Sequence, residues 1–563
     1  MLPLININRN LRSLNRYREV LGVLVTHGFG QIIEQLNLDY YLEMGKRIIT
    51  RNPEAKHIER LPAPVRLRMV MEKLGPTFIK LGQMLSARPD ILPDAYLLEL
   101  RKLQNEVPPF SAAEVEKQIK KELGAPASEL FDKFYPQPVA AASIAQVHKA
   151  SLHDGTEVAI KVRRPGIEKI IETDLDILRA LAMLLEKHGG LGNLCSPSEI
   201  VQEFNRTIYR ELDFTKEGHT FGRFRSNFTD NDHVYIPQIF WEYSTEAILT
   251  MEFVDGIKIS ETKQLENAGY NLQHIADIGA QAFQEQFLSH GLFHGDPHPG
   301  NVMVVGPETI CFLDLGMVGS ISDDLKQQLS DLLLGIYRRD TERIAAVMLT
   351  AREKHKEINI AALKRDITEF IDDYYQVPLS RINSSKLINE FIYMMKKHHI
   401  KFPSDLMLLA KAIITIEGIG RQLDPDFNII EHIEPAATEL IKQRISGAKI
   451  QKELGLIVHA YADLAKTLPR DIKELLYQVN NNNFKIDLEH RGLEKVICDL
   501  DKSSNRISFS FIIGSLIIGS SIIMQADSGP HIFGIPALGM LGYTIAGALG
   551  LWLAIGILRS GRL

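Results

Sequence analysis

The chain has 563 residues, of which 45% are hydrophobic and 24% charged, close to the average of globular proteins. This composition excludes a disordered, collagen-like or disulfide-scaffold protein, and the length allows about two to four folding units. Lys and Arg number 64 against 70 Asp and Glu, so there is no overall basic field and we expect no nucleic-acid partner. The three cysteines lie far apart, which is typical of reduced thiols in a cytosolic compartment.

The first 125 residues are predicted to be helical. Residues 1–60 contain apolar groups that fit an amphipathic helix, which would either contact a membrane or pack against the protein. Residues 61–125 form a separate helical unit with breaks at Gly75-Pro76 and Pro108-Pro109. The N-terminus lacks the pattern of a secretory signal, so we expect the body of the protein in the cytoplasm.

Residues 126–255 are predicted to form a small β-rich lobe. The segments IAQVHKASL and TEVAIKVRR, separated by the turn residues HDG, indicate a hairpin. Two helical stretches follow, at about residues 168–187 and 198–225, the second with Ser198 as its cap. YIPQIFWEY and AILTMEFVDG are then typical of two further strands.

Residues 256–480 are predicted to form a larger, mainly helical lobe. One compact segment interrupts it, HGDPHPGNVMVVGPETICFLDLGMVG, which has the pattern of a loop, a strand, a turn and a strand. The sequence therefore indicates an α+β protein with two lobes and a helical extension at its N-terminal side.

The C-terminal region contains two uncharged, apolar stretches. Residues 507–524 and 532–558 comprise 18 and 27 residues, and each is long enough to cross a hydrocarbon core of about 30 Å as a helix. We interpret residues 507–558 as a two-helix transmembrane anchor, preceded by a linker at 481–506. Five glycines should let the two helices approach closely: Gly514, Gly519, Gly542, Gly547 and Gly550.

The charges that flank the two stretches predict the orientation of this hairpin. Lys502 and Arg506 precede the first stretch, Arg559 and Arg562 follow the second, and the loop between them has neither Lys nor Arg. Basic flanking residues stay on the cytoplasmic side of a membrane, so both termini and the body are expected in the cytoplasm. Membrane lipid is thus the first partner that the sequence predicts.

The segment HGDPHPGN carries the strongest chemical signal. Asp296 and Asn301 have the spacing D-x-x-x-x-N, and Asp314 follows 13 residues after Asn301, at the end of the apolar run ICFLD. Phosphoryl transfer from a nucleotide needs a divalent metal held by such oxygen donors, and an Asp that orients the attacking hydroxyl or water. We predict that Asn301 and Asp314 bind Mg²⁺ and that Asp296 orients the attacking nucleophile.

Lys161 lies upstream in VAIKV, which matches the V-A-I-K strand of protein kinases. Its ammonium group would reach the α and β phosphates of ATP in the cleft between the lobes. Kinases pair this Lys with an acid on a later helix, where this chain offers Glu211, Asp213 and Glu217. Glu211 and Glu217 are the better candidates, and the sequence leaves the choice between them open.

The strand AILTMEFVDG has the pattern of the connection between the two lobes of a kinase. Met251 and Glu252 are therefore predicted to lie near the adenine edge of the nucleotide.

In combination, these motifs resemble the UbiB family of atypical kinase-like proteins. The similarity runs from about Leu74 to Gly319 through KLGPTFIKLGQMLSARPDILP, AAASIAQVHKA, VAIKVRRPGI, ELDFTKEG, HGDPHPGN and DLG, in the family's order. The C-terminal apolar hairpin is similar to that of the bacterial ubiquinone-biosynthesis members. The resemblance implies an atypical protein-kinase-like bilobal fold, with the lobes at 126–255 and 256–480, held at the bacterial inner membrane.

Two differences from protein kinases are shared with that family. The first is Ala140, Ala141, Ala142 and Ser143, which stand where kinases have a glycine-rich loop over the phosphates. Methyl groups restrict the backbone and hold it farther from a nucleotide than glycine would. ATP positioning should therefore differ from that in a protein kinase.

The second difference is the family's KxGQ signature, in which Lys80 and Gln83 share one helix face. The resemblance implies that this face covers the site where a kinase receives its peptide, with Lys80 reaching acids such as Glu211 and Asp213. A cleft covered in this way would exclude large protein substrates.

Gly295 replaces the arginine that in many kinases receives an activation-loop phosphate. The sequence after DLGMVG soon becomes helical and leaves no long activation segment. Regulation by phosphorylation of such a segment is therefore not expected.

Sequence and resemblance together predict a membrane-anchored atypical kinase or ATPase that binds ATP and Mg²⁺ and supports ubiquinone biosynthesis. It would act on, or present, membrane-embedded polyprenyl intermediates, with ubiquinone precursors and ubiquinone-biosynthesis enzymes as further partners. Two alternatives stay open, a small-molecule or lipid kinase and a nucleotide-dependent scaffold for those enzymes. The sequence also leaves open the phosphoryl acceptor and the oligomeric state.

Overall fold

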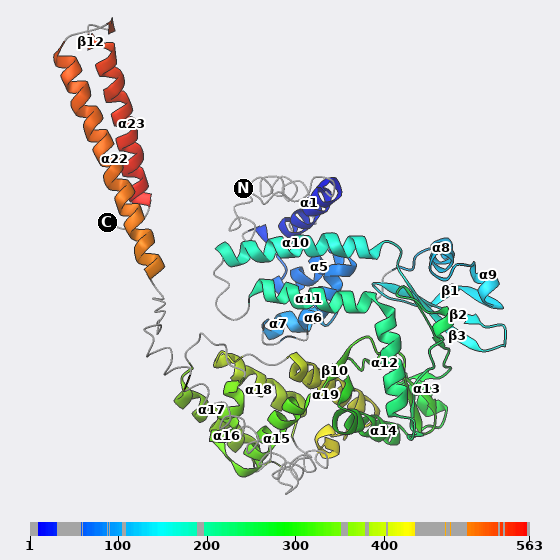
Figure 1. Ribbon diagram of the computed structural model, residues 1–563. Coiled ribbons are helices and arrows are strands. Elements are labelled where there is room, and N and C mark those ends of the chain that lie inside the picture. Colours follow the sequence, from blue (N-terminus) through cyan, green and yellow to red (C-terminus); the bar gives the residue numbers. More distant parts are fainter. Residues whose placement is uncertain are drawn as a thin grey trace. The chain divides into compact units, whose positions relative to one another are not determined.

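The computed structural model describes residues 10–30, 60–86, 91–103, 108–188, 196–350, 358–375, 382–400, 404–433, 493–526, 530–532 and 535–559, and singly residues 58, 88, 377, 468 and 473. The chain separates into two compact units, Met1–Lys452 and Glu453–Leu563. The first unit combines helices with small sheets, and the second is built around two long helices (Figure 1). This is the mixed α+β fold that the sequence predicts.

Helices from the N-terminal part of the chain pack together on one side of the first unit (Figure 1). They are α1 (Asn10–Thr26), α5 (Ala63–Leu74), α6 (Pro76–Ser86), α7 (Asp94–Leu100), α10 (Ile167–His188) and α11 (Pro197–Leu212). Gly75, with φ of 91°, ends α5, and Pro76 begins α6, so the chain turns between them. Phe78 of α6 and Ile171 of α10 are buried in the same core, which holds the KxGQ helix α6 against the rest of the unit.

The β-rich lobe is an antiparallel sheet in the order β1-β2-β3-β5. Its strands are β1 (Lys133–Ala141), β2 (Ala145–Ser151), β3 (Glu157–Arg163) and β5 (Ile248–Glu252). The predicted hairpin is confirmed as β2 and β3, which pair along their whole length. Val158, Ile160 and Val162 of β3 are buried in one core with Val115 of helix α8 (Ala112–Leu123). Because side chains alternate along a strand, Lys161 points to the opposite face.

The helical stretch expected at 198–225 is divided into two helices, α11 and α12 (Phe214–Asn227). Asp213 separates them, because its carboxylate accepts a hydrogen bond from the Thr215 N–H at 3.2 Å and caps α12. The predicted cap at Ser198 is wrong. Ser196 caps α11 instead, and Pro197 takes the first helical position, where a missing N–H costs nothing.

The expected strand YIPQIFWEY is also largely wrong. Only Val234–Tyr235 (β4) is extended in a sheet, and it pairs in parallel with β9 (Thr309–Phe312) of the other lobe. Pro237 then removes a backbone donor, which limits further pairing. Trp241–Tyr243 forms a short 3₁₀ helix. Of the two strands expected here, AILTMEFVDG joins the β1-β2-β3-β5 sheet as β5, and YIPQIFWEY contacts it through an isolated antiparallel bridge between Ile239 and Met251.

The helical lobe contains a second sheet in the order β4-β9-β8-β6, with β6 (Ile257–Lys258) and β8 (Val302–Gly306). A separate pair of strands, β7 (Leu292–His294) and β10 (Val318–Ser320), brackets the HGDPHPGN loop and the DLG segment. Around these strands lie α14 (Leu272–Glu285), α15 (Asp323–Arg338), α16 (Thr341–Thr350), α17 (Ile360–Tyr375), α18 (Ser384–Lys397) and α19 (Ser404–Leu423). The pairing of β7 with β10 brings together the two motifs that the sequence analysis assigns to a metal.

The second unit contains α22 (Leu493–Gln525) and α23 (Ala537–Arg559), which pack along each other (Figure 1). Ser503–Gln525 and Ala537–Ala554 are long and apolar enough to span a membrane, with mean hydropathies of 2.1 and 1.6. A side chain at Gly542 would collide with Ser520 of α22, as expected for a close approach. A Cβ at the other four predicted glycines would meet nothing within 4 Å, so their predicted role in helix contact is wrong.

The domain boundaries derived from the sequence stay predictions. The boundaries at residues 480 and 481, and most of the predicted segment 1–60, lie outside the described residues. Helix α22 begins at Leu493, inside the stretch expected to be a linker. The described helix of the N-terminal segment, α1, packs on α5 and α10, which favours the packing interpretation of that segment.

An ion pair across this packing generates a stability prediction. Arg16 of α1 donates to both carboxylate oxygens of Asp174 on α10, at 2.8 and 3.1 Å, and the Asp174 side chain is fully buried. Breaking a buried pair from one side leaves an uncompensated charge. We expect Arg16→Met to lower the free energy of unfolding by about 3 kcal/mol, measured by urea denaturation. Arg18→Met, at an exposed position of the same helix, should change it by less than about 0.5 kcal/mol. Equal effects of the two variants would contradict this account.

Candidate functional site

A cavity of about 930 Å³ lies between the β1-β2-β3-β5 sheet, the KxGQ helix α6 and the helical lobe. Most of the predicted site residues line it: Lys80, Gln83, Ala142, Ser143, Lys161, Glu211, Glu217, Asp296, Asn301 and Asp314. Five others do not line it: Ala140, Ala141, Asp213, Met251 and Glu252. The four residues that we assigned to Mg²⁺–ATP therefore face a common space, although they come from distant parts of the sequence. They are Lys161, Asp296, Asn301 and Asp314.

Lys161 is paired with Glu217. Its ammonium group donates to both carboxylate oxygens, at 2.8 and 2.7 Å, and Glu217 is only 7% exposed. Burial opposes the charge on Lys161, but Glu217 and Asp314 outweigh it and raise the pKa of Lys161 above its usual range. Burial also raises the pKa of Glu217 to about 7, against the effect of Lys161. The choice that the sequence left open is therefore settled geometrically in favour of Glu217.

Glu211 has a different partner, Lys80 of the KxGQ helix, at 2.7 Å. Burial opposes the charge on Lys80, while Glu211 and Asp314 raise its pKa. Gln83, one turn farther along α6, donates to the Leu103 carbonyl at 3.3 Å. Asp213, which the resemblance placed near Lys80, instead caps α12 and lies 3.4 Å from Lys216. Lys80 and Lys161 therefore approach Asp314 from two elements, each with its own carboxylate.

Asn301 and Asp314 meet at one end of the cavity. The Asn301 amide donates to one oxygen of Asp314 at 3.4 Å, and the Gly316 N–H donates to the other at 2.8 Å. Burial would raise the pKa of Asp314, but Lys161 and this backbone N–H lower it to about 2. The carboxylate is therefore ionised at neutral pH, the form that binds a divalent cation.

The alanine-rich segment is divided between a strand and a turn. Ala140 and Ala141 are the last residues of β1, whereas Ala142 and Ser143 turn into β2 and line the cavity. The Ala142 N–H donates to the Ala145 carbonyl at 2.7 Å, which closes the turn. The Ser143 hydroxyl is fully buried and has no hydrogen-bond partner among the described residues. An unsatisfied buried hydroxyl is costly, and one that borders a cavity is a donor available to a ligand.

Met251 and Glu252 lie at the end of β5, next to β3. Met251 is buried, and Glu252 accepts a hydrogen bond from the Tyr235 hydroxyl at 2.6 Å. Their assignment to the adenine edge stays a prediction.

One residue at the site was not predicted from the sequence, because it belongs to none of the recognised motifs. Lys411 of α19 lies 3.0 Å from the Asp296 carboxylate and lines the same cavity. It is 115 positions beyond Asp296. The sequence does contain one indication of this residue, since Lys411 is the one charged residue in the apolar run LMLLAKAIITI.

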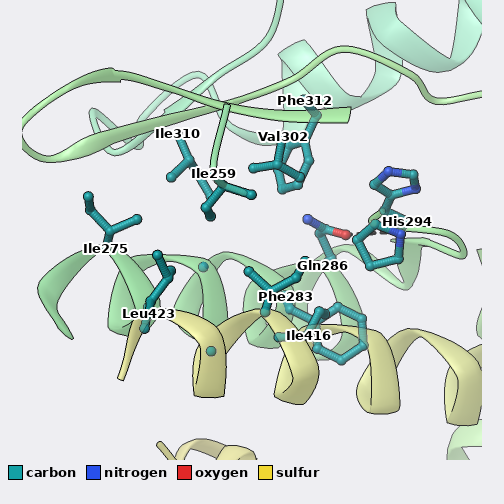
Figure 2. A pocket seen from close by; sticks show the side chains of 15 residues that line it. Ile259, Ile275, Phe283, Gln286, His294, Val302, Ile310, Phe312, Ile416 and Leu423 are labelled. Carbon is teal, nitrogen blue, oxygen red and sulfur yellow. Dashed lines mark hydrogen bonds between the residues drawn. The ribbon is translucent and has the colours of Figure 1, made fainter. Parts of the chain in front are cut away.

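Behind the HGDPHPGN loop lies a small apolar cavity of about 40 Å³, shown in Figure 2. Ile416 and Leu423 of α19 face Val302 and Phe312 of the second sheet across it. His294 borders both cavities, and its backbone N–H donates to the Gln286 side chain at 2.9 Å. Burial lowers the pKa of His294, so the imidazole is neutral and acts as a packed support for the loop.

Three regions of the chain match known protein families. Residues 102–348 match the ABC1 atypical kinase-like domain, residues 367–428 the UbiB helical domain, and residues 491–559 the ABC1/UbiB kinase-like C-terminal domain. The regions follow one another in the chain and together include Lys161, Asp296, Asn301 and Asp314 and the two long C-terminal helices, while Lys80 and Gln83 lie before the first of them.

Whole proteins are similar as well. The chain is 34% identical to the "Uncharacterized protein in hydrogenase 1 5'region" of Clostridium pasteurianum, over 98% of this chain and 100% of that protein. It is 35% identical to the chloroplastic protein ACTIVITY OF BC1 COMPLEX KINASE 7 of Arabidopsis thaliana, over 69% of this chain and 56% of that one. The solved Rv3197–erythromycin complex from Mycobacterium tuberculosis is 23% identical and covers 65% of this chain and 93% of its own, with a TM-score of 0.45, too low to support an inference.

The Probable protein kinase UbiB of Marinobacter nauticus is 32% identical to this chain over 87% of it and 90% of that protein. With the matching domains and the gathered kinase motifs, this similarity shows that the chain belongs to the UbiB/ABC1 family of atypical kinase-like proteins.

Proposed function

We propose that this protein binds Mg²⁺–ATP in the cavity of about 930 Å³ and catalyses phosphoryl transfer from it to a small acceptor or to water. The observation that carries the proposal is the presence of Lys161, Asp296, Asn301 and Asp314 around one space. These side chains come from β3, from the loop after β7 and from the segment after β9. Such a set is what phosphoryl transfer requires, since catalysis there consists mainly of positioning and electrostatic stabilisation.

The side chains present fit the nucleotide and its metal. Asn301 and Asp314, already in contact, offer oxygen atoms of the type that Mg²⁺ takes together with phosphate oxygens. Lys161 and the Ser143 hydroxyl would bind phosphate, and the pairing with Glu217 holds Lys161 in place. Mg²⁺–ATP would supply an activated phosphoryl group whose negative charge the metal partly neutralises.

Asp296 would orient the acceptor and receive the proton of its hydroxyl group. The KxGQ helix α6 limits which acceptor can enter, because Lys80 reaches across to Glu211 and Gln83 holds Leu103 on the same side of the cavity. A peptide segment of a folded protein would meet this helix. A small molecule, a lipid head group or water would not.

The two long helices of the second unit would anchor the protein in the bacterial inner membrane, with both termini in the cytoplasm. Support comes from their length and hydropathy, from the match of residues 491–559 to the family's C-terminal domain, and from the flanking basic residues. A role in ubiquinone biosynthesis, next to polyprenyl intermediates in the bilayer, follows from family membership and from the UbiB protein of Marinobacter nauticus as a relative.

The role of Asp296 is open to a direct test. In Asp296→Asn the amide cannot accept a proton, so ATP turnover should fall by about 100-fold or more while Mg²⁺–ATP affinity stays within about twofold. ADP formation by the full-length protein would be measured with anionic liposomes and a phenolic quinone precursor, because ADP is released whether the acceptor is water or a small molecule. If wild type and variant form ADP at the same rate, the enzymatic proposal is replaced by the nucleotide-dependent scaffold.

Asp314 should matter for binding itself. Asp314→Asn removes the ionised metal ligand, so ATP affinity should fall by about tenfold or more in Mg²⁺ and should no longer respond to EDTA. Equilibrium binding of a fluorescent ATP analogue measures this. Asp366→Asn is the matched control, because Asp366 is paired with Lys397 and His398 in the helical lobe, outside the cavity. Metal-dependent affinity that survives in Asp314→Asn would remove this residue from the site.

The membrane proposal predicts an effect of charge in the two long helices. Ile518 and Leu551 are 63% and 66% exposed in the hairpin, as expected for lipid contact. Arginine near the centre of a span costs about 2.5–3.5 kcal/mol. Ile518→Arg combined with Leu551→Arg should therefore move the protein out of the carbonate-resistant membrane fraction. Ser504→Arg, at the start of the candidate span Ser503–Gln525, should leave the protein in that fraction. Equal fractionation of wild type and both variants would argue against spanning helices.

A further inference from the structure

We propose that Lys411 is a positioning residue that fixes the Asp296 carboxylate toward the phosphoryl acceptor. The proposal rests on the proposed function, because Asp296 is the group that would receive the acceptor's proton. Lys411 Nζ lies 3.0 Å from Asp296 Oδ1. With one oxygen held in this way, the second carboxylate oxygen is left for the hydroxyl group that enters the cavity.

The loop itself cannot supply this cation. The segment HGDPHPGN contains neither Lys nor Arg. The two other lysines discussed at the cavity already have acidic partners, Lys161 with Glu217 and Lys80 with Glu211. The cation that contacts Asp296 is therefore Lys411 of α19, a helix from a distant part of the chain.

Gly295 explains how α19 comes close enough. A Cβ at this position would lie 2.6–2.7 Å from three carbon atoms of Leu408, a separation that real contacts do not show. The backbone of the loop thus rests directly on Leu408. Leu408 and Lys411 are three residues apart and share one face of α19. One helix face therefore contacts Gly295 through a leucine and Asp296 through a lysine.

Helix α19 is a fixed support for this lysine. Ala412, Ile419 and Leu423 are buried, and Figure 2 shows Ile416 and Leu423 directed into the apolar space beneath the second sheet. Glu417 of the same helix, 2% exposed, accepts hydrogen bonds from Ser384 and Ser385 of α18. Met407 and Leu409, before Lys411 in the same helix, are buried as well. Because the helix is held on both sides of Lys411, the ammonium group has a defined place relative to the loop.

The exposure of the pair indicates a role in orientation rather than in stability. The side chains of Lys411 and Asp296 are 25% and 40% exposed, and ion pairs of this kind contribute little to folding. Both side chains line the cavity. The pair would therefore act by restraining the orientation of the Asp296 carboxylate. The rate of phosphoryl transfer is sensitive to such an orientation.

The test compares Lys411→Met and Lys411→Arg with wild type as full-length protein in liposomes. We expect Lys411→Met to lower kcat for ATP turnover by about tenfold or more, with KM and Mg²⁺–ATP affinity within about twofold and Tm within about 2 °C. Lys411→Arg should retain at least about a third of kcat, because it keeps a cation on the same helix. Lys397→Met is the control, since it breaks a Lys–Asp pair at 2.6 Å in the same lobe, outside the cavity.

A second readout does not depend on activity. Backbone hydrogen exchange of the peptide that contains residues 294–301 should become faster in Lys411→Met and stay unchanged in Lys411→Arg and Lys397→Met. Joint loss of Tm, nucleotide affinity and turnover without rescue by arginine would show a merely structural lysine and overturn the proposal. Wild-type-like kcat in Lys411→Met would also overturn it, while leaving the proposed function intact. Absence of turnover in wild type, at the level of Asp296→Asn, would overturn the proposed function and this role with it.

Discussion

The site depends on the pairing of charges that are brought into one partly closed space. Lys161, Lys80 and Lys411 each contact a carboxylate from another element, at 2.7, 2.7 and 3.0 Å. The Lys161–Glu217 and Lys80–Glu211 pairs are largely buried, and leaving one of their ions unpaired would cost several kcal/mol. These two pairs therefore hold β3 against α12 and α6 against α11, whereas the more exposed Lys411–Asp296 pair contributes little to stability and restrains a single carboxylate.

The same charges suit the proposed binding of a polyanion together with a cation. Asp314 keeps its charge at neutral pH because Lys161 and a backbone N–H favour it. The lysines in turn keep theirs because of the acids next to them. Triphosphate needs cations, and Mg²⁺ needs oxygen donors that stay ionised. The alternation of the two signs around the cavity meets both needs.

Short motifs with fixed chemistry could be predicted from the sequence. VAIK, D-x-x-x-x-N and DLG each carry their meaning within a few residues, and the resemblance ordered them into two lobes. The cap at Ser196 was missed although Pro197 directly after it is a helix-start signal. The pairing of β4 was missed for another reason, since each of its residues pairs with a residue of β9 that lies 76 positions later. Local pattern contains no information on such a partner.

The choice between Glu211 and Glu217 as the partner of Lys161 is a second feature that could not be predicted from the sequence. Both lie in one helical stretch of the sequence, on either side of Asp213, and the pattern of residues does not say which of them meets Lys161. The break at Asp213 starts a new helix, so the two glutamates point to different lysines. Asp213 itself caps α12 and does not line the cavity. Whether an Asp continues a helix or caps the next depends on tertiary packing, which a single sequence does not display.

Gly295 relates the missing side chain at this position to the close approach of α19. Where many kinases carry an arginine that senses a phosphate on the activation loop, a side chain here would collide with Leu408. The absence of that arginine and the approach of α19 therefore have one geometric cause. The segment after Asp314 is correspondingly short, since β10 begins at Val318 and α15 at Asp323, capped by Ser322. A loop fixed from behind by a helix has no need of a phosphate to set its position, and this arrangement favours a site that is assembled by folding rather than by a switch.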